Sequence, residues 1–200
     1  MVALGSPRQI TDLLKYITIQ VCSMPTKCKF QRRLVETCYH LLETMGGTFP
    51  LQCLEDNVSV TFPTGVFKSS PRQQTTAIEK SFYITLKYID SMFDNDGIPD
   101  QWTTQDKLEN FHHIIFRLIE ENSCIMDKTQ ESLDDFFSRE ASLRAYFDKI
   151  ATVLKEKGFQ YCAWEFARKE ILRALQFILK EDFHSTWARH DSGAKHEFLK

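Results

Sequence analysis

Glycine and proline are scarce in this chain, and their scarcity is the strongest constraint on its fold. The 200 residues include 7 glycines and 6 prolines, about half of the roughly 12% that these residues contribute to an average protein. Because tight turns depend on them, the chain is poorly suited to an all-β sandwich. Long helices are favoured instead, and the length suits one domain with a sizeable core.

Five segments have the apolar spacing of amphipathic helices. Apolar residues recur at every third or fourth position in each of them, which forms one stripe for burial in a core. These predicted helices cover about residues 27–45, 75–93, 101–122, 139–157 and 161–182. Residues 46–74 have no helical period and predict a long connection. We therefore predict an all-α fold, a five-helix up-up-down-down bundle with an overhand first connection, as in cytokines.

The charge balance and the hydropathy exclude two kinds of partner. The chain has 25 basic and 27 acidic side chains and a formal net charge of −2, so it lacks the basic excess of nucleic-acid-binding proteins. No run approaches the 18 apolar residues of a membrane span. We expect neither nucleic-acid binding nor direct membrane insertion.

Six cysteines are spread along the chain, at positions 22, 28, 38, 53, 124 and 162. None of them forms a Cys-x-x-Cys pair, which weakens zinc and thioredoxin-like interpretations. An even count with this spread suits extracellular disulfides. Residues 1–21, in contrast, do not follow the signal-peptide pattern, because Arg8, Asp12 and Lys15 interrupt the apolar stretch that a signal peptide needs.

The most specific motif lies in residues 146–175. There the letters LKEK end one predicted helix, and CAWE, beginning at Cys162, opens the last one after a short loop. Other motifs occur in a matching order: Cys53-Leu54 followed by Phe62-Pro63, and Trp102 placed 22 residues before Cys124. Over about residues 22–182 this ordered set resembles the type I interferon family. The additional cysteines resemble those of fish-type members.

The resemblance implies a division of the chain and two disulfides. It places an interferon-like domain at 22–182, after an atypical leader or alternative-start segment at 1–21 and before a flexible polar tail at 183–200. The implied disulfides are Cys22–Cys124 and Cys53–Cys162. Each bridge closes a loop of about 100 residues, which on paper removes roughly 4 to 5 kcal/mol of chain entropy from the unfolded state.

Two cysteines then have no family partner. If Cys28 and Cys38 both lie in the first helix, a rise of 1.5 Å per residue separates them by about 15 Å. A disulfide needs Cα atoms within about 7 Å, so both would be unpaired thiols. If Cys28 precedes the helix, a Cys28–Cys38 bridge becomes the alternative.

The resemblance also implies a receptor-binding surface on the last helix. The family's high-affinity receptor chain contacts this helix, and Arg168 and Arg173 match basic contacts there, with Leu172 and Gln176 beside them. Leu54 in the first loop matches an apolar contact to the same chain. The helical period independently predicts a charged outer side for the last helix, made of Glu165, Lys169, Arg173, Gln176 and Lys180.

The match to the family's receptor contacts is incomplete in two places. Asn57 replaces the basic contact that the family places three residues after Leu54, and it begins a glycosylation sequon whose glycan would crowd the same surface. For the second receptor chain, Arg144 matches a family position on the fourth helix. At the positions of the family's aromatic contacts on the third helix, this chain has Phe111 and Ile115. The helical period assigns both residues to the core.

By resemblance, the chain is a cytokine that bridges two class II cytokine receptor chains, triggers JAK-STAT signalling and induces antiviral genes. We expect a secreted monomer that performs no chemistry and needs no cofactor. Because residues 1–21 lack a convincing signal peptide, an intracellular isoform is an alternative, as is another helical cytokine.

A ferritin-like di-iron enzyme is a remote alternative, because Glu-x-x-His occurs twice, at Glu109 and His112 and at Glu181 and His184. Glu109 lies about 160° around the helix from Phe111 and should face water. The second pair falls where the last helix ends. No glycine-rich phosphate loop or nucleophile elbow occurs, so the sequence favours neither catalysis nor a bound metal.

Overall fold

The computed structural model describes residues 28–55, 58–68, 75–94, 98–99, 102, 105–128 and 133–180. Within these ranges the regular structure is helical, with no β-strand. Its α-helices are α2 (Arg32–Gly46), α3 (Thr75–Met92), α4 (Gln105–Asn122), α5 (Leu133–Glu156) and α6 (Tyr161–Lys180). Three short 3₁₀ turns join them: η1 (Leu51–Cys53), η2 (Thr64–Phe67) and η3 (Ser123–Ile125). The predicted all-α, five-helix fold is confirmed.

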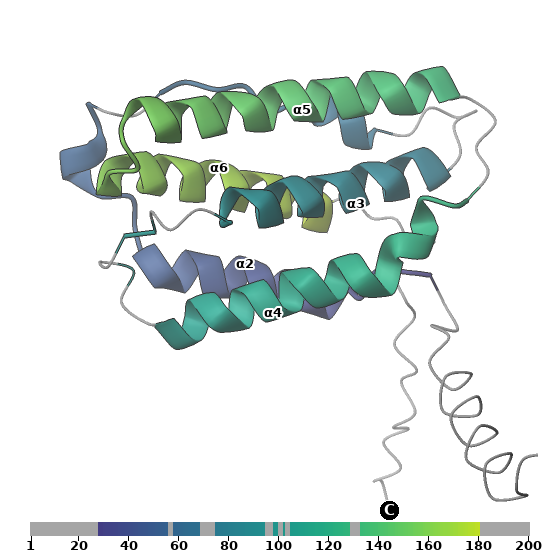
Figure 1. Cartoon of the computed structure of the whole chain (residues 1–200), viewed down its shortest axis with the longest axis horizontal. Coiled ribbons are helices and arrows are strands. Elements are labelled where there is room, and N and C mark those ends of the chain that lie inside the picture. Colours follow the sequence, from purple (N-terminus) through teal and green to yellow (C-terminus); the bar gives the residue numbers. More distant parts are fainter. Residues whose placement is uncertain are drawn as a thin grey trace, which may run out of the picture.

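Helices α2 and α3 are consecutive in sequence but do not contact each other in the described part of the chain. They run in the same direction (Figure 1), so the connection between them passes overhand along the bundle. Helix α4 runs the opposite way beside α2, since Lys107 near the start of α4 lies next to Thr44 near the end of α2. Helix α6 is also antiparallel to α2, which makes α2, α3, α4 and α6 an up-up-down-down set with α5 as the fifth helix.

The apolar stripes predicted from sequence meet in one core. Trp164, Phe111, Phe82 and Leu143 from four different helices are each at most 1% exposed, and burying a side chain of this kind contributes roughly 1.5 to 3 kcal/mol. Helix α6 is enclosed over its first turns, because every residue from Ala163 to Arg168 is buried. Among the described helices, none is both long and apolar enough to cross a bilayer.

Three helices begin at different residues from those predicted, and one of them is α4, which starts at Gln105 rather than near 101. Helix α2 starts at Arg32 rather than near residue 27, because the segment before it is extended and places the buried ring of Phe30 against Phe82, with 6.1 Å between ring centroids. Helix α5 starts at Leu133 rather than near 139. Its added turns are held by buried Arg139, which donates hydrogen bonds to the carbonyls of Val66 and Lys68 in the overhand connection.

The described residues contain two disulfides, and one of them differs from the implied pairing. Cys53 is joined to Cys162, as the resemblance implies, and this bridge ties η1 to the first turn of α6. The implied Cys22–Cys124 bridge is replaced by Cys28–Cys124, with 6.1 Å between Cα atoms. The prediction was wrong because Cys28 precedes α2 and lies in the extended segment, where it reaches the end of α4. Cys22 lies outside the described residues.

Cys38 is the free cysteine of the described residues, and it is completely buried in α2. The alternative Cys28–Cys38 bridge is therefore wrong, although its premise that Cys28 precedes the helix is correct. Burial raises the pKa of the Cys38 thiol well above its ordinary value, so the group stays protonated and is a poor nucleophile.

Peptide mapping of the folded protein under non-reducing conditions tests these assignments. We expect one linked peptide pair containing Cys28 and Cys124 and another containing Cys53 and Cys162. An alkylating reagent should modify Cys38 only after the protein is unfolded, since its thiol is inaccessible in the core. A peptide pair linking Cys22 to Cys124, or rapid alkylation of Cys38 under native conditions, would contradict the structure.

Candidate functional site

The outer side of α6 presents a short row of polar side chains beside the overhand connection. The side chains of Arg173 and Lys169 are 38% and 29% exposed, Gln176 is exposed and Leu172 is half-buried. The exposed side predicted from the helical period is thus present for these residues. It is interrupted, however, by neighbours on the same helix that face inward.

Arg173 and Lys169 are both held by neighbouring groups. The Nη1 atom of Arg173 donates to the carboxylate of Glu170 at 2.8 Å and to the carbonyl of Val60 at 3.0 Å. The ammonium of Lys169 lies 5.6 Å from the ring centroid of Phe49 and 5.3 Å from that of Phe166. Both distances are within the range of cation–π attraction.

The 3₁₀ turn η1 adds an apolar part to this side of the molecule. Leu54, directly after η1, is 55% exposed, and Leu51 is 83% exposed. The Cys53–Cys162 disulfide holds this turn against the start of α6. We refer to Leu51, Leu54, Lys169, Leu172, Arg173 and Gln176 as the α6–η1 surface. Sequence reasoning missed Leu51, whose exposure depends on the turn. Asn57 lies outside the described residues.

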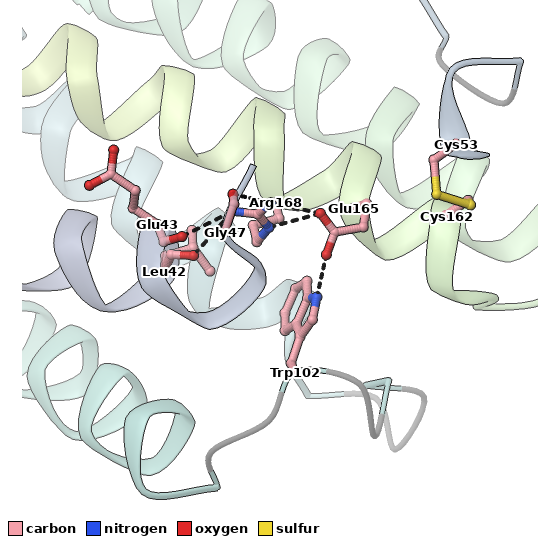
Figure 2. A network of polar contacts seen from close by, with 8 residues as sticks. All are labelled: Leu42, Glu43, Gly47, Cys53, Trp102, Cys162, Glu165 and Arg168. Carbon is pink, nitrogen blue, oxygen red and sulfur yellow. Dashed lines mark hydrogen bonds and ion pairs between the residues drawn. A yellow bond between two sulfur atoms is a disulfide. The ribbon is translucent and has the colours of Figure 1, made fainter. Parts of the chain in front are cut away.

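Arg168 is not on the α6–η1 surface. Arg168 as a whole is only 2% exposed, and its guanidinium points into the bundle toward the end of α2 (Figure 2). It donates to the carbonyl of Gly47 at 2.9 Å and, more weakly, to those of Leu42 and Glu43 at 3.4 Å each. The expectation that Arg168 contacts a receptor is therefore wrong for this structure, because its donors are already used inside the protein.

The physical reason is that Arg168 caps another helix. The last carbonyls of an α-helix have no partner within the helix, and the negative end of the helix dipole lies there. The chain leaves α2 through Gly47, whose φ of 65° is a left-handed conformation suited to glycine. The planar guanidinium can reach several of these oxygens at once. It supplies a donor to the carbonyl of Gly47 and a second donor to that of Glu43, which already accepts from the Gly47 N–H.

The charge of Arg168 is balanced by Glu165, which the helical period had placed on the outer side and which is fully buried. One carboxylate oxygen of Glu165 accepts from Arg168 at 2.7 and 3.1 Å, and the other accepts from the indole of Trp102 at 2.7 Å. Gly46 must be small here, since an added Cβ would lie 2.7 Å from Glu165 Oε1 and closer still to the guanidinium. The network joins α2, α6 and the segment before α4 (Figure 2).

We expect Arg168→Ala to lower the free energy of unfolding by about 3 to 5 kcal/mol, since it leaves the Glu165 carboxylate buried without its counter-ion. Urea unfolding followed by circular dichroism measures this change. The matched control is Arg117→Ala on α4, whose pair with Glu121 is exposed and should contribute at most about 1 kcal/mol. Equal effects of the two substitutions would show that the buried network does not stabilise the fold.

Arg144 lies on a different side of the bundle. Its side chain is 62% exposed on α5 and pairs with Glu140 at 3.4 Å. Two neighbours raise the pKa of the guanidinium above its ordinary value. The larger effect comes from a hydrogen bond with Tyr88 on α3, and the smaller one from the carboxylate of Glu140. Phe111 and Ile115 are fully buried, as the helical period predicted. On α4 the exposed aromatic residue is instead Phe116, at 60%, which the sequence analysis did not single out.

The residues considered for a di-iron site do not converge. Glu109 is exposed, whereas the ring of His112 packs against Phe93 and Phe111 with centroid distances of 5.3 and 6.1 Å. Within the described ranges, no three His, Cys, Asp or Glu side chains are placed to hold a metal ion. Glu181 and His184 lie outside these ranges.

An up-up-down-down bundle with an overhand first connection and long-range disulfides defines a helical cytokine. The family model for the interferon alpha/beta domain matches residues 28–182. The chain therefore belongs to the type I interferon family. Members of this family are receptor-binding cytokines, not enzymes.

Individual relatives agree with this assignment. The chain is 41% identical to zebrafish interferon 2, with a TM-score of 0.72 over 76% of this chain and 98% of that one, and this similarity confirms the expected fish-type character. It is 30% identical to interferon alpha-1 of horse over 67% of this chain and 73% of the relative, and 31% identical to human interferon omega-1 over 68% and 70%. Zebrafish interferon 1, at 21% identity and a TM-score of 0.60, shares the fold.

Proposed function

We propose that this protein bridges two class II cytokine receptor chains, so that their associated Janus kinases activate STAT factors and antiviral genes are induced. The observation that carries the proposal is the α6–η1 surface, which combines partly exposed cations of α6 with exposed leucines of η1, the turn that a disulfide ties to the start of α6. The mechanism is proximity: the ligand makes no chemical change and brings two receptor tails together.

The composition of the α6–η1 surface suits a binding site of high affinity. Arginine is favoured at the energetic centre of interfaces, since its planar group pairs with carboxylates while its stem buries apolar area. Arg173 is a partly exposed arginine of this kind, and Leu51 and Leu54 supply exposed apolar side chains on the turn that is tied to the start of α6. We therefore assign the higher-affinity receptor chain to this surface, with Lys169, Leu172 and Gln176 as further contacts.

We assign the second receptor chain to the side formed by α3 and α5, where Arg144 is exposed. Two separate sides are required because one ligand must touch both chains at once. Arg173 contacts the overhand connection through Val60, whereas Arg144 lies beside Tyr88 of α3. Both disulfides favour action outside the cell, in an oxidising environment, where the receptor chains are reached.

We expect Arg173→Ala to weaken binding to the ectodomain of the higher-affinity receptor chain by about 1 to 3 kcal/mol, or roughly 5- to 150-fold in Kd. Surface plasmon resonance measures the affinity, and an antiviral assay on reporter cells should show a parallel loss of potency. Arg117→Ala is the matched control, because it removes an arginine that also pairs with a glutamate on its own helix.

The two variants together separate recognition from general charge effects. Unchanged affinity in Arg173→Ala would contradict the assignment of the higher-affinity receptor chain to the α6–η1 surface. An equal loss in Arg117→Ala would mean that net charge, and not the α6–η1 surface, accounts for the change. Circular dichroism and urea unfolding of both variants establish that each is folded.

Arg144→Ala should separate signalling from first-chain binding. We expect the affinity for the higher-affinity chain to stay within about twofold, while the antiviral potency falls by roughly 3- to 10-fold, the effect of a contact contributing about 1 kcal/mol. Assembly of both ectodomains on the ligand, measured by mass photometry or ultracentrifugation, should be reduced in the same variant. Wild-type potency would contradict a role for Arg144 in the second contact.

A further inference from the structure

One buried carboxylate lies beneath both cations of the α6–η1 surface. The side chain of Glu170 is 1% exposed. Its Oε2 atom accepts from Arg173 Nη1 at 2.8 Å, and its Oε1 atom lies 3.3 Å from Lys169 Nζ. Glu170 therefore cannot touch a receptor itself, but it contacts both of the charged groups that we assign to receptor binding.

The carboxylate is itself fixed from the other side by α5. The hydroxyl of Tyr146, a buried residue, donates to Glu170 Oε2 at 2.8 Å and lies 3.2 Å from the backbone carbonyl of the same residue. Burial and the nearby carboxylate raise the pKa of the Tyr146 phenol, so the phenol keeps the proton that it donates. Glu170 is thus an oriented acceptor and not a freely rotating one.

Arg173 is held at a second point as well. Its Nη1 atom also donates to the carbonyl of Val60 in the overhand connection, yet the side chain remains 38% exposed. A side chain that is already ordered loses less conformational entropy when a partner binds, so its contacts give more affinity. Arg117, in contrast, is exposed and pairs with Glu121 on its own helix at 2.6 Å, and that glutamate is itself 37% exposed.

We propose that Glu170 is a positioning residue, which orders Arg173 and Lys169 in the free protein so that the α6–η1 surface is formed before a receptor arrives. This role rests on the proposed function, but the order of Arg173 can be measured without any receptor. The positioning role of Glu170 and the proposed receptor binding can therefore be tested separately.

The first test uses the wild-type protein alone. Relaxation of the ¹⁵Nε nuclei reports how rigid each arginine side chain is on the picosecond to nanosecond scale. We expect a high order parameter for Arg173 and a low one for Arg117. Equal mobility of these two arginines would overturn the proposal, whatever the receptor measurements show.

The second test uses Glu170→Gln, which keeps the volume and an acceptor oxygen but removes the charge. We expect the order parameter of Arg173 to fall and the Kd for the ectodomain of the higher-affinity receptor chain to rise by about 3- to 10-fold. In a Lys169→Ala, Arg173→Ala background the same substitution should change Kd by less than twofold, since no cation is left to position.

These outcomes distinguish positioning from a purely structural role. A structural role predicts the same loss of affinity in both backgrounds, and that result would overturn the proposal. Ile115→Val is the stability control: it removes one methyl group from a fully buried side chain of α4, so it should lower stability with Kd within twofold of wild type. If Arg173→Ala binds normally, the proposed function fails, while the order parameters still decide the role of Glu170.

Discussion

The buried pair of Glu165 and Arg168 is the interaction on which the rest of the structure depends. Arg168 satisfies carbonyls at the end of α2, and Glu165 both balances that charge and accepts from Trp102. Helix α6 is thereby joined to the helix that begins the bundle and to the segment that precedes α4. A buried ion pair of this kind is weak evidence for net stability, but its hydrogen bonds connect all three segments at one point.

The polar residues of α6 divide into two sets that lie within one turn of each other. Glu165, Arg168 and Glu170 face inward and are buried, whereas Lys169 and Arg173 reach outward. The inward set connects the helix to its neighbours, and the outward set is the part that we assign to recognition. The two sets meet at Glu170, because its carboxylate lies inside while its ion-pair partners reach the surface.

How far the sequence could predict this arrangement depends on the type of residue. Apolar periodicity placed Phe111, Ile115 and Trp164 in the core, since burial of large apolar side chains follows the helical repeat. The same method assigned Glu165 outward, because it treats every charged residue as solvated. A helix surrounded on most sides buries charges that have internal partners, and those partners, Trp102 and the carbonyls near Gly47, are distant in sequence. The position of Cys28 was missed for a related reason. Phe30 packs against Phe82, which is distant in sequence, and α2 therefore begins at a later residue than predicted.

The long sequence separations within this fold have a consequence for the chain during its synthesis. Arg168 and Gly47 are 121 residues apart, and the Cys53–Cys162 bridge spans 109 residues. At roughly 5 to 20 residues per second, a ribosome needs about 6 to 24 s to extend the chain from Gly47 to Arg168. During that interval the apolar stripes of the earlier helices lack the helix that covers them. Aggregation and chaperone capture compete with folding most strongly then, before α6 has been made.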